Sequence, residues 1–102
     1  MKALLKRPGK VPVLTVTPNT IRELFQVTVG GKIEVSTDKT MAGRFAVLSD
    51  KGAKEAGQPY NCEINNVNFW GNILIAGIEG EEFTDLPEAV ARIIVDYITW
   101  EF

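Results

Sequence analysis

The side chains that support the common forms of enzymatic catalysis are scarce in this sequence of 102 residues. It contains no histidine and one cysteine, Cys62. Ser-His and Cys-His mechanisms therefore lack their general base. A zinc site would have to combine one thiolate with carboxylates, since imidazole ligands are missing. The sequence predicts a non-catalytic protein without a metal or other cofactor, in which Cys62 is a small buried residue with no disulfide partner.

Carboxylates follow the longest apolar run of the chain. Clustered carboxylates can bind Mg²⁺ or Ca²⁺ or form an acid–base pair. The spacing here matches no calcium loop, and acidic residues at the start of a helix also complement its dipole. We therefore interpret most of the cluster as a helix start and keep Glu81 and Glu82 as candidate binding residues. The full cluster is Glu79, Glu81, Glu82, Asp85 and Glu88.

Asparagines and aromatic residues gather between residues 60 and 72. Asparagine tolerates left-handed backbone, so the amides are explained by loop structure on one interpretation. On the other, they form a polar rim beside aromatic rings, as in a ligand pocket or an interface. Phe69 and Trp70 are adjacent, so on a strand they point to opposite faces and one stays accessible. The candidate binding residues are Tyr60, Asn61, Asn68, Trp70 and Asn72.

Charge is distributed unevenly along the chain. Residues 1–54 hold ten Lys or Arg and four acids, a balance of +6, whereas residues 55–102 hold one Arg and nine acids, a balance of −8. Either the two halves neutralise each other in the fold or they offer charged faces to a partner. Nucleic-acid binding is not favoured, because only Lys2, Lys6, Arg7 and Lys10 cluster in sequence and an alternating strand would divide them between faces.

The pattern of elements predicts one α+β domain, with a mostly antiparallel sheet of five to six strands and two helices. The continuous apolar run at 73–78, bounded by Gly71 and Gly80, indicates a strand covered on both faces. Helices are expected between Thr20 and Gly30 and over about 86–98. Strands are expected at 2–6, 11–17, 32–36, 44–48, 60–64 and 73–78.

Local signals refine these expectations. Thr20 and Glu23 fit a capping box. Pro12 cannot donate to a ladder, so the strand at 11–17 should have a free edge. Residues 37–40 read as a turn, and Ile33 and Val35 should face inward on the strand before it. The second helix should bury a stripe formed by Leu86, Ala89, Val90, Ile93, Ile94, Tyr97 and Ile98.

The ends of the chain add two expectations. Trp100 and Phe102 extend the apolar surface of the second helix, which suggests docking on the sheet or on a second copy in a homodimer. The first residues contain too short an apolar stretch for a signal peptide, and no segment approaches the length of a membrane span. A cytoplasmic protein without membrane contact is therefore expected.

Six short motifs occur along the chain, at residues 1–10, 19–21, 30–35, 59–61, 70–72 and 80–86. In this order and spacing they resemble an uncharacterised family of small proteins that is catalogued as a domain of unknown function. Members of that family occur in gut Firmicutes and in their phages and conjugative elements. The similarity spans roughly residues 1–90 and implies an α+β fold, a mobile-element setting and no known activity. The family usually has a basic residue in place of Cys62.

Two functions of different classes remain. The first is a phage or mobile-element accessory protein that binds and inhibits a host defence protein, in keeping with the resemblance and the acidic second half. The second is a small-ligand binder, such as a sponge for signalling nucleotides. In that protein Trp70 or Tyr60 would stack on a base. The phosphate would be held by Lys6, Arg7, Lys32 and Arg44.

Overall fold

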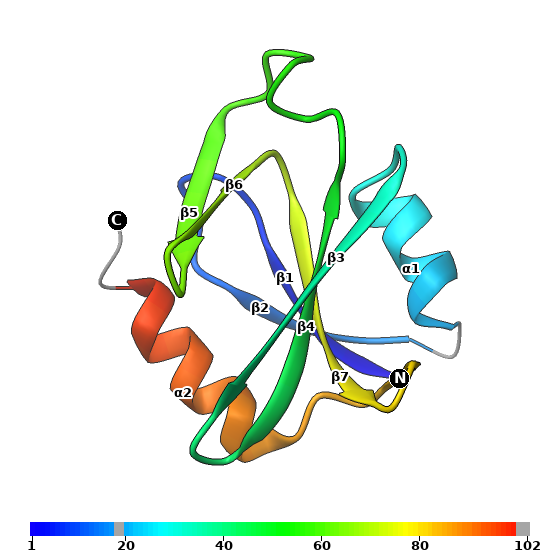
Figure 1. Ribbon diagram of the computed structural model, residues 1–102, viewed down its shortest axis with the longest axis vertical. Helices are drawn as coiled ribbons and strands as arrows, with labels where there is room; N and C mark the ends of the chain where they lie inside the picture. Colours follow the sequence, from blue (N-terminus) through cyan, green and yellow to red (C-terminus); the bar gives the residue numbers. More distant parts are fainter. Residues whose placement is uncertain (18–19, 100–102) are drawn as a thin grey trace.

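The computed structural model describes residues 1–17 and 20–99, which form eight strands and two helices (Figure 1). The predicted α+β class, with two helices and a mostly antiparallel sheet of five to six strands, is confirmed, and the main sheet has six strands. The predicted strand at 60–64 lies outside it, in a separate two-stranded sheet, and two short strands, at 67–70 and 82–84, were not predicted. In chain order the elements are β1 Lys2–Lys6, β2 Val13–Val16, α1 Ile21–Thr28, β3 Ile33–Thr40, β4 Gly43–Asp50, β5 Tyr60–Ile64, β6 Val67–Trp70, β7 Ile73–Glu79, β8 Glu82–Thr84 and α2 Glu88–Thr99.

Strand β7 lies at the centre of the sheet, whose order is β2-β1-β7-β4-β3 with β8 paired to the end of β7. Every pairing is antiparallel. Residues 73–77 are all buried, which confirms the prediction of a strand covered on both faces. Because β7 comes from the acidic half of the chain and its neighbours β1 and β4 from the basic half, the two halves interleave within one sheet.

Two hydrophobic cores lie on opposite faces of the sheet, because successive side chains of a strand point to opposite faces. On β7, Ile73 and Ile75 pack in the core shared with α2 and the β5–β6 hairpin. Leu74 and Ala76 pack in the other core, which α1 covers. The molecule therefore has three layers, with α1 on one side of the sheet and α2 and the hairpin on the other (Figure 1).

The β5–β6 hairpin forms a small sheet of its own. Asn65 and Asn66 make its tight turn with φ values of 49° and 68°, so the loop interpretation of the amides holds for these two. Gly71, with φ 71°, then redirects the chain from β6 into the main sheet at β7. Gly71 thus separates the aromatic pair Phe69–Trp70, which belongs to the hairpin, from the apolar run at 73–78, which belongs to the main sheet.

The predicted turn at 37–40 is wrong, because β3 continues to Thr40 and the chain reverses at residues 41–42. The Thr40 hydroxyl accepts a hydrogen bond from the Ala42 N–H at 3.1 Å, which stabilises the later turn. Strand β3 is an edge strand, where polar side chains are tolerated. Val35 is 41% exposed, against the expectation that it faces inward, whereas Ile33 packs against the core beneath α1.

Most of the stripe predicted for the second helix is buried, and Ala91 and Val95 widen its apolar face as expected. The prediction is wrong for Ala89, which is exposed, and for Ile93, which is 40% exposed. The face that meets the core consists of Val90, Ala91, Ile94 and Ile98, with Leu86 buried just before the helix. The side chain of Tyr97 and the whole of Trp100 and Phe102 lie outside the described residues, as does the homodimer contact expected from them. The capping box of α1 is confirmed, since the Glu23 N–H donates to Thr20 Oγ1 at 3.2 Å.

Candidate functional site

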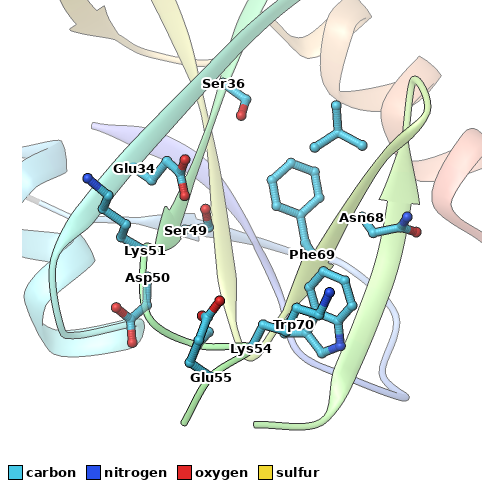
Figure 2. Close-up of a pocket in the computed structure, with 12 residues that line it drawn as sticks. Glu34, Ser36, Ser49, Asp50, Lys51, Lys54, Glu55, Asn68, Phe69 and Trp70 are labelled. Atoms are coloured by element: carbon cyan, nitrogen blue, oxygen red, sulfur yellow. The ribbon is translucent and has the colours of Figure 1, made fainter. Parts of the chain in front are cut away.

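A polar groove of about 250 Å³ lies between the outer strands of the sheet and the β5–β6 hairpin (Figure 2). One wall comes from β3 and β4 and carries Glu34, Ser36 and Ser49. The opposite wall is β6, residues 67–70, and the loop at 51–55 closes one end. Trp70, the central residue of the predicted site, therefore lines a groove.

Strand pairing explains the polar wall. Glu34 lies opposite Ser49, and Ser36 lies opposite Val47. Residues that are paired across two strands point to the same face, here the face toward the hairpin. Ser49 is only 7% exposed, and its hydroxyl makes no hydrogen bond with a described residue. Since no buried side-chain N or O atom of the described residues lacks a partner, this hydroxyl is open to the solvent in the groove.

The hairpin wall is mainly apolar at its base. Phe69 is 5% exposed and directs its ring toward the space between Ser36 and Ser49 (Figure 2). Asn68 turns its amide away from Glu34 and Ser49 (Figure 2). The Tyr60 hydroxyl donates to Asn68 Oδ1 at 2.9 Å across the hairpin. Asn68, one of the predicted binding residues, thus lines the groove, although its amide is directed away from the polar wall.

Trp70 is held between two neighbours. The Tyr60 ring meets it edge to face, with ring centroids 5.5 Å apart and planes at 79°. The Lys54 ammonium lies 4.8 Å from the centre of the Trp70 ring, a cation–π contact. Trp70 is half-buried, while Phe69 is buried, so the expectation that one of the two rings stays accessible is confirmed.

Two of the predicted binding residues have structural roles. Asn61 is buried, and its amide donates to the carbonyls of Lys6 at 2.8 Å and Gly71 at 2.6 Å. The Asn72 amide donates to the Thr28 carbonyl at 2.9 Å, which connects the start of β7 to the end of α1. These bonds join the hairpin to β1 and the sheet to α1.

Lys6 is fully buried beneath the hairpin, so its ammonium is withdrawn from solvent. It donates to the Arg7 carbonyl at 2.7 Å and to Asn61 Oδ1 at 3.0 Å. Burial lowers the pKa of Lys6 below its ordinary value, because desolvation penalises the charged form, and the negative charge of an ionised Cys62 acts in the opposite direction. Lys6 therefore belongs to the interior network with Asn61 and is not part of an exposed phosphate site.

The other predicted phosphate-binding cations are exposed but dispersed. Lys32 precedes the start of β3, whereas Arg44 pairs with Lys39 near its far end, roughly 20 Å along the strand. Arg7 follows β1, which is three strand spacings, about 14 Å, from β3 in the sheet. These cations do not converge on one site.

Glu81 and Glu82 lie at the turn between β7 and β8, at the opposite end of β7 from Trp70. They border a second hollow of about 480 Å³ together with Arg22 and Phe83. The Arg22 guanidinium lies 5.2 Å from the centre of the Phe83 ring. This pair of carboxylates is therefore separate from the groove, by roughly 20 Å along β7.

The cations that do border the groove, Lys51 and Lys54, were absent from the predicted site, as were Glu34, Ser36 and Ser49. The sequence feature that could have indicated Glu34 and Ser36 is the alternation of polar residues 34, 36 and 38, which share one face of a strand. The alternation does not show which face meets the hairpin, because that depends on how β3 pairs with β4 and where β5–β6 folds over them.

The free edge of β2 is the second surface of interest. Thr17 and the first residue exchange hydrogen bonds in both directions, with the Thr17 N–H donating to the Met1 carbonyl at 2.9 Å. In an antiparallel ladder, hydrogen-bonded pairs alternate with non-hydrogen-bonded pairs. Since the pair at Thr17 is hydrogen-bonded, the pairs at Val16 and Leu14 are non-hydrogen-bonded, and these two residues direct their backbone N–H and C=O groups away from β1. Pro12 lies at the end of this edge, as predicted. The exposed apolar residues are Val11 at 61%, Val13 at 49%, Leu14 at 50% and Val16 at 69%.

Fold and surface together define a small three-layer α+β domain with a polar groove and an apolar sheet edge. The chain belongs to the DUF3846 family, a domain of unknown function whose family model matches residues 1–99. Neither the curated proteins nor the solved structures contain a match to it.

Neither helix of the described residues combines the length and the apolar character needed to cross a membrane. Across residues 1–17 and 20–99, no three His, Cys, Asp or Glu side chains gather closely enough to hold a metal ion.

Proposed function

We propose that the chain is a non-catalytic interaction module that binds another protein through the free edge of β2. The observation that carries this proposal is an edge strand with outward backbone groups at Leu14 and Val16 and exposed apolar side chains on both faces. A strand that adds to such an edge gains main-chain hydrogen bonds, and the alternate side chains provide specificity. Soluble proteins usually protect their edges with charged residues. Residues 11–17 carry none.

The surface beside the edge supports a partner with a particular chemistry. A hollow of about 490 Å³ separates β2 from α2 and is bordered by Leu14, Val95 and Asp96. The carboxylate of Glu88 is paired with Arg92 at 2.7 Å, whereas Asp96 makes no ion pair with any described residue. A partner segment with alternating apolar residues and a basic flank complements this surface. A second copy would bring another Asp96 carboxylate to the same place.

The setting of the partner follows from the resemblance to proteins of phages and conjugative elements. We propose a host protein, specifically a defence protein that the bound module inhibits. Module and target would then meet in the cytoplasm. Inhibition by occupation of a surface requires no catalytic group from this chain, consistent with its lack of histidine.

The test compares the wild-type chain with Leu14→Lys and with a matched control, Val27→Lys. Val27 is 81% exposed on α1, which covers the opposite face of the sheet from α2. Each chain serves as bait in a lysate of a Firmicutes host, and a captured protein is purified for titration. Leu14→Lys should weaken its affinity by at least roughly tenfold, as expected for an apolar residue at the centre of an interface. Val27→Lys should leave the affinity unchanged.

Other outcomes overturn the proposal. If all three chains capture the same protein equally well, the binding surface is not the β2 edge. If no chain captures a protein above background, the chain does not bind a host protein. Analytical ultracentrifugation supplies a further check. If the wild type and Val27→Lys dimerise at micromolar concentration while Leu14→Lys stays monomeric, the edge is occupied by a second copy instead of a partner protein.

A further inference from the structure

The groove between β3, β4 and β6 has a binding capacity that no contact within the described chain uses. Ser49 is 7% exposed, and its hydroxyl makes no hydrogen bond with a described residue. No buried side-chain N or O atom of the described residues lacks a partner, so this hydroxyl is open to the groove and can bond to a molecule that enters it. Ser49 faces the groove between Glu34 and Phe69 (Figure 2), where a ligand or water can reach it.

The polar wall favours a ligand that donates hydrogen bonds. The Glu34 carboxylate makes no ion pair with any described residue and can accept two parallel N–H bonds. Asp50 is already engaged, since its Oδ1 accepts from the backbone N–H groups of Lys32 at 3.3 Å and Gly52 at 3.1 Å. Glu55 also lines the groove, but it belongs to the loop at the mouth. Glu34 is therefore the carboxylate that the polar wall offers for recognition, and Ser49, its partner across the strands, is the adjacent hydroxyl.

The opposite wall and the volume favour a flat, small body. Phe69 presents an aromatic ring, and Val67 and Ala53 add apolar surface. At about 250 Å³, the groove lies below the range of roughly 300–1,000 Å³ that is typical for drug-sized ligands. A planar heterocycle between the apolar wall and the polar wall satisfies both sides of the groove.

The mouth of the groove carries charges of both signs. Lys51 and Lys54 are exposed there, together with the carboxylates of Asp50 and Glu55. Lys54 already contacts the Trp70 ring, which keeps its ammonium near the opening. An anionic substituent on the ring is therefore accommodated at the mouth, while the ring itself lies inside.

We infer that this groove is a nucleotide site for guanine, independent of the proposed protein-binding edge of β2. Guanine presents two neighbouring N–H donors on one edge, and these match the two oxygens of the Glu34 carboxylate. Adenine places a ring acceptor beside its amine, so one carboxylate oxygen would face a lone pair. Ser49 bonds a further polar atom of the base, Phe69 packs on the ring, and Lys51 and Lys54 approach the phosphate.

Calorimetric titration of the full chain with guanosine 5′-monophosphate and adenosine 5′-monophosphate tests this inference. The guanine nucleotide should bind more tightly than the adenine nucleotide. Ser49→Ala should weaken it roughly tenfold, the effect of one hydrogen bond at the upper end of the usual range. Glu34→Gln should weaken the guanine nucleotide and reduce the preference over adenine. Thr37→Ala, an exposed hydroxyl on the other face of β3, is the matched control and should bind like the wild type.

The inference is overturned if millimolar guanosine 5′-monophosphate produces neither binding heat nor a rise in melting temperature, since a ligand that binds the folded state must stabilise it. The inference is also overturned if the wild type binds both nucleotides with equal affinity and Glu34→Gln does not change either affinity. Circular dichroism of each variant verifies that the fold is intact. Leu14→Lys should retain the wild-type nucleotide affinity, so failure of this site and failure of the β2 edge give different results.

Discussion

Lys6 is an ionisable residue placed where water cannot reach its ammonium group, and its environment makes stability depend on pH. Its folded-state pKa is lowered, chiefly by desolvation. Between that lowered value and the ordinary value of about 10.4, the unfolded chain binds more protons than the folded chain. The free energy of unfolding should therefore rise with pH across this window, because the cost of burying a charged Lys6 disappears as the group loses its proton.

The contribution of Lys6 to the free energy of unfolding is measured by urea unfolding from pH 7 to pH 10. Two chains are compared, Cys62→Ala as the parent and the double variant Cys62→Ala with Lys6→Met, so that no thiol is present in either. The parent should gain stability relative to Lys6→Met as pH increases. A difference between the two that stays constant over the whole range would contradict the burial of a titrating ammonium at this position.

At the same scale, the asparagines show how far the sequence could specify the site. Their concentration correctly marked the hairpin as unusual, but their types did not distinguish a turn residue from a buried bridge. Asn65 and Asn66 make the turn, whereas Asn61 joins the hairpin to β1. Asn61 acquires that role because Lys6, 55 residues away in sequence, lies beneath it. No local pattern contains that contact.

At the scale of elements, Gly77 is required by the crossing of two chain segments. It lies in β7, where an added Cβ would be 2.3 Å from the carbonyl oxygen of Asp85. Asp85 belongs to the segment that leads from β8 to α2. Gly77→Ala should therefore push that connection away from the sheet and reduce the free energy of unfolding by about 1–3 kcal/mol, the usual cost of overpacking.

The matched control for Gly77→Ala is Gly52→Ala, where an added Cβ meets no atom within 4 Å. Chemical denaturation of both variants decides between a steric effect and a general effect of replacing glycine. Gly52→Ala should change stability by less than about 1 kcal/mol. Equal losses in the two variants would show that the backbone of residues 84–86 does not press on β7.

Elements with a strong local signal were predictable. The capping box at Thr20, the buried strand at 73–78 and the free edge marked by Pro12 were each specified by residues that are neighbours in sequence. The prediction failed where tertiary context decides. Residues 37–40 look like a turn but lie on an edge strand whose polar side chains face solvent and the hairpin. The exposed face of α2 likewise depended on where the helix crosses the sheet.

At the scale of the whole molecule, the charge imbalance of the sequence does not produce two separate lobes. Strand β7 of the acidic half lies between β1 and β4 of the basic half. Within the described ranges, the ion pair that joins the halves is the amino terminus with Asp85, at 3.9 Å. The halves are therefore joined mainly by backbone pairing and apolar burial, and moderate salt should have little effect on the fold.

The layered arrangement also predicts where the molecule opens first. The six-stranded sheet is covered on both faces, whereas the β5–β6 hairpin pairs only with itself and rests on one core. Two-stranded hairpins are marginally stable alone, so β5–β6 depends on the packing of Cys62, Ile64 and Phe69 and on the hydrogen bonds of Asn61.

Amide hydrogen exchange should be faster in β5 and β6 than in β4 and β7, because local opening of the hairpin has a lower free energy than opening of the sheet. Asn61→Ala should widen that difference, because it removes buried bonds to Lys6 and Gly71. Asn68→Ala removes one exposed bond to Tyr60 and should widen it less. Uniform protection of all four strands would mean that hairpin and sheet open together, and the groove wall formed by β6 would then be as rigid as the sheet it faces.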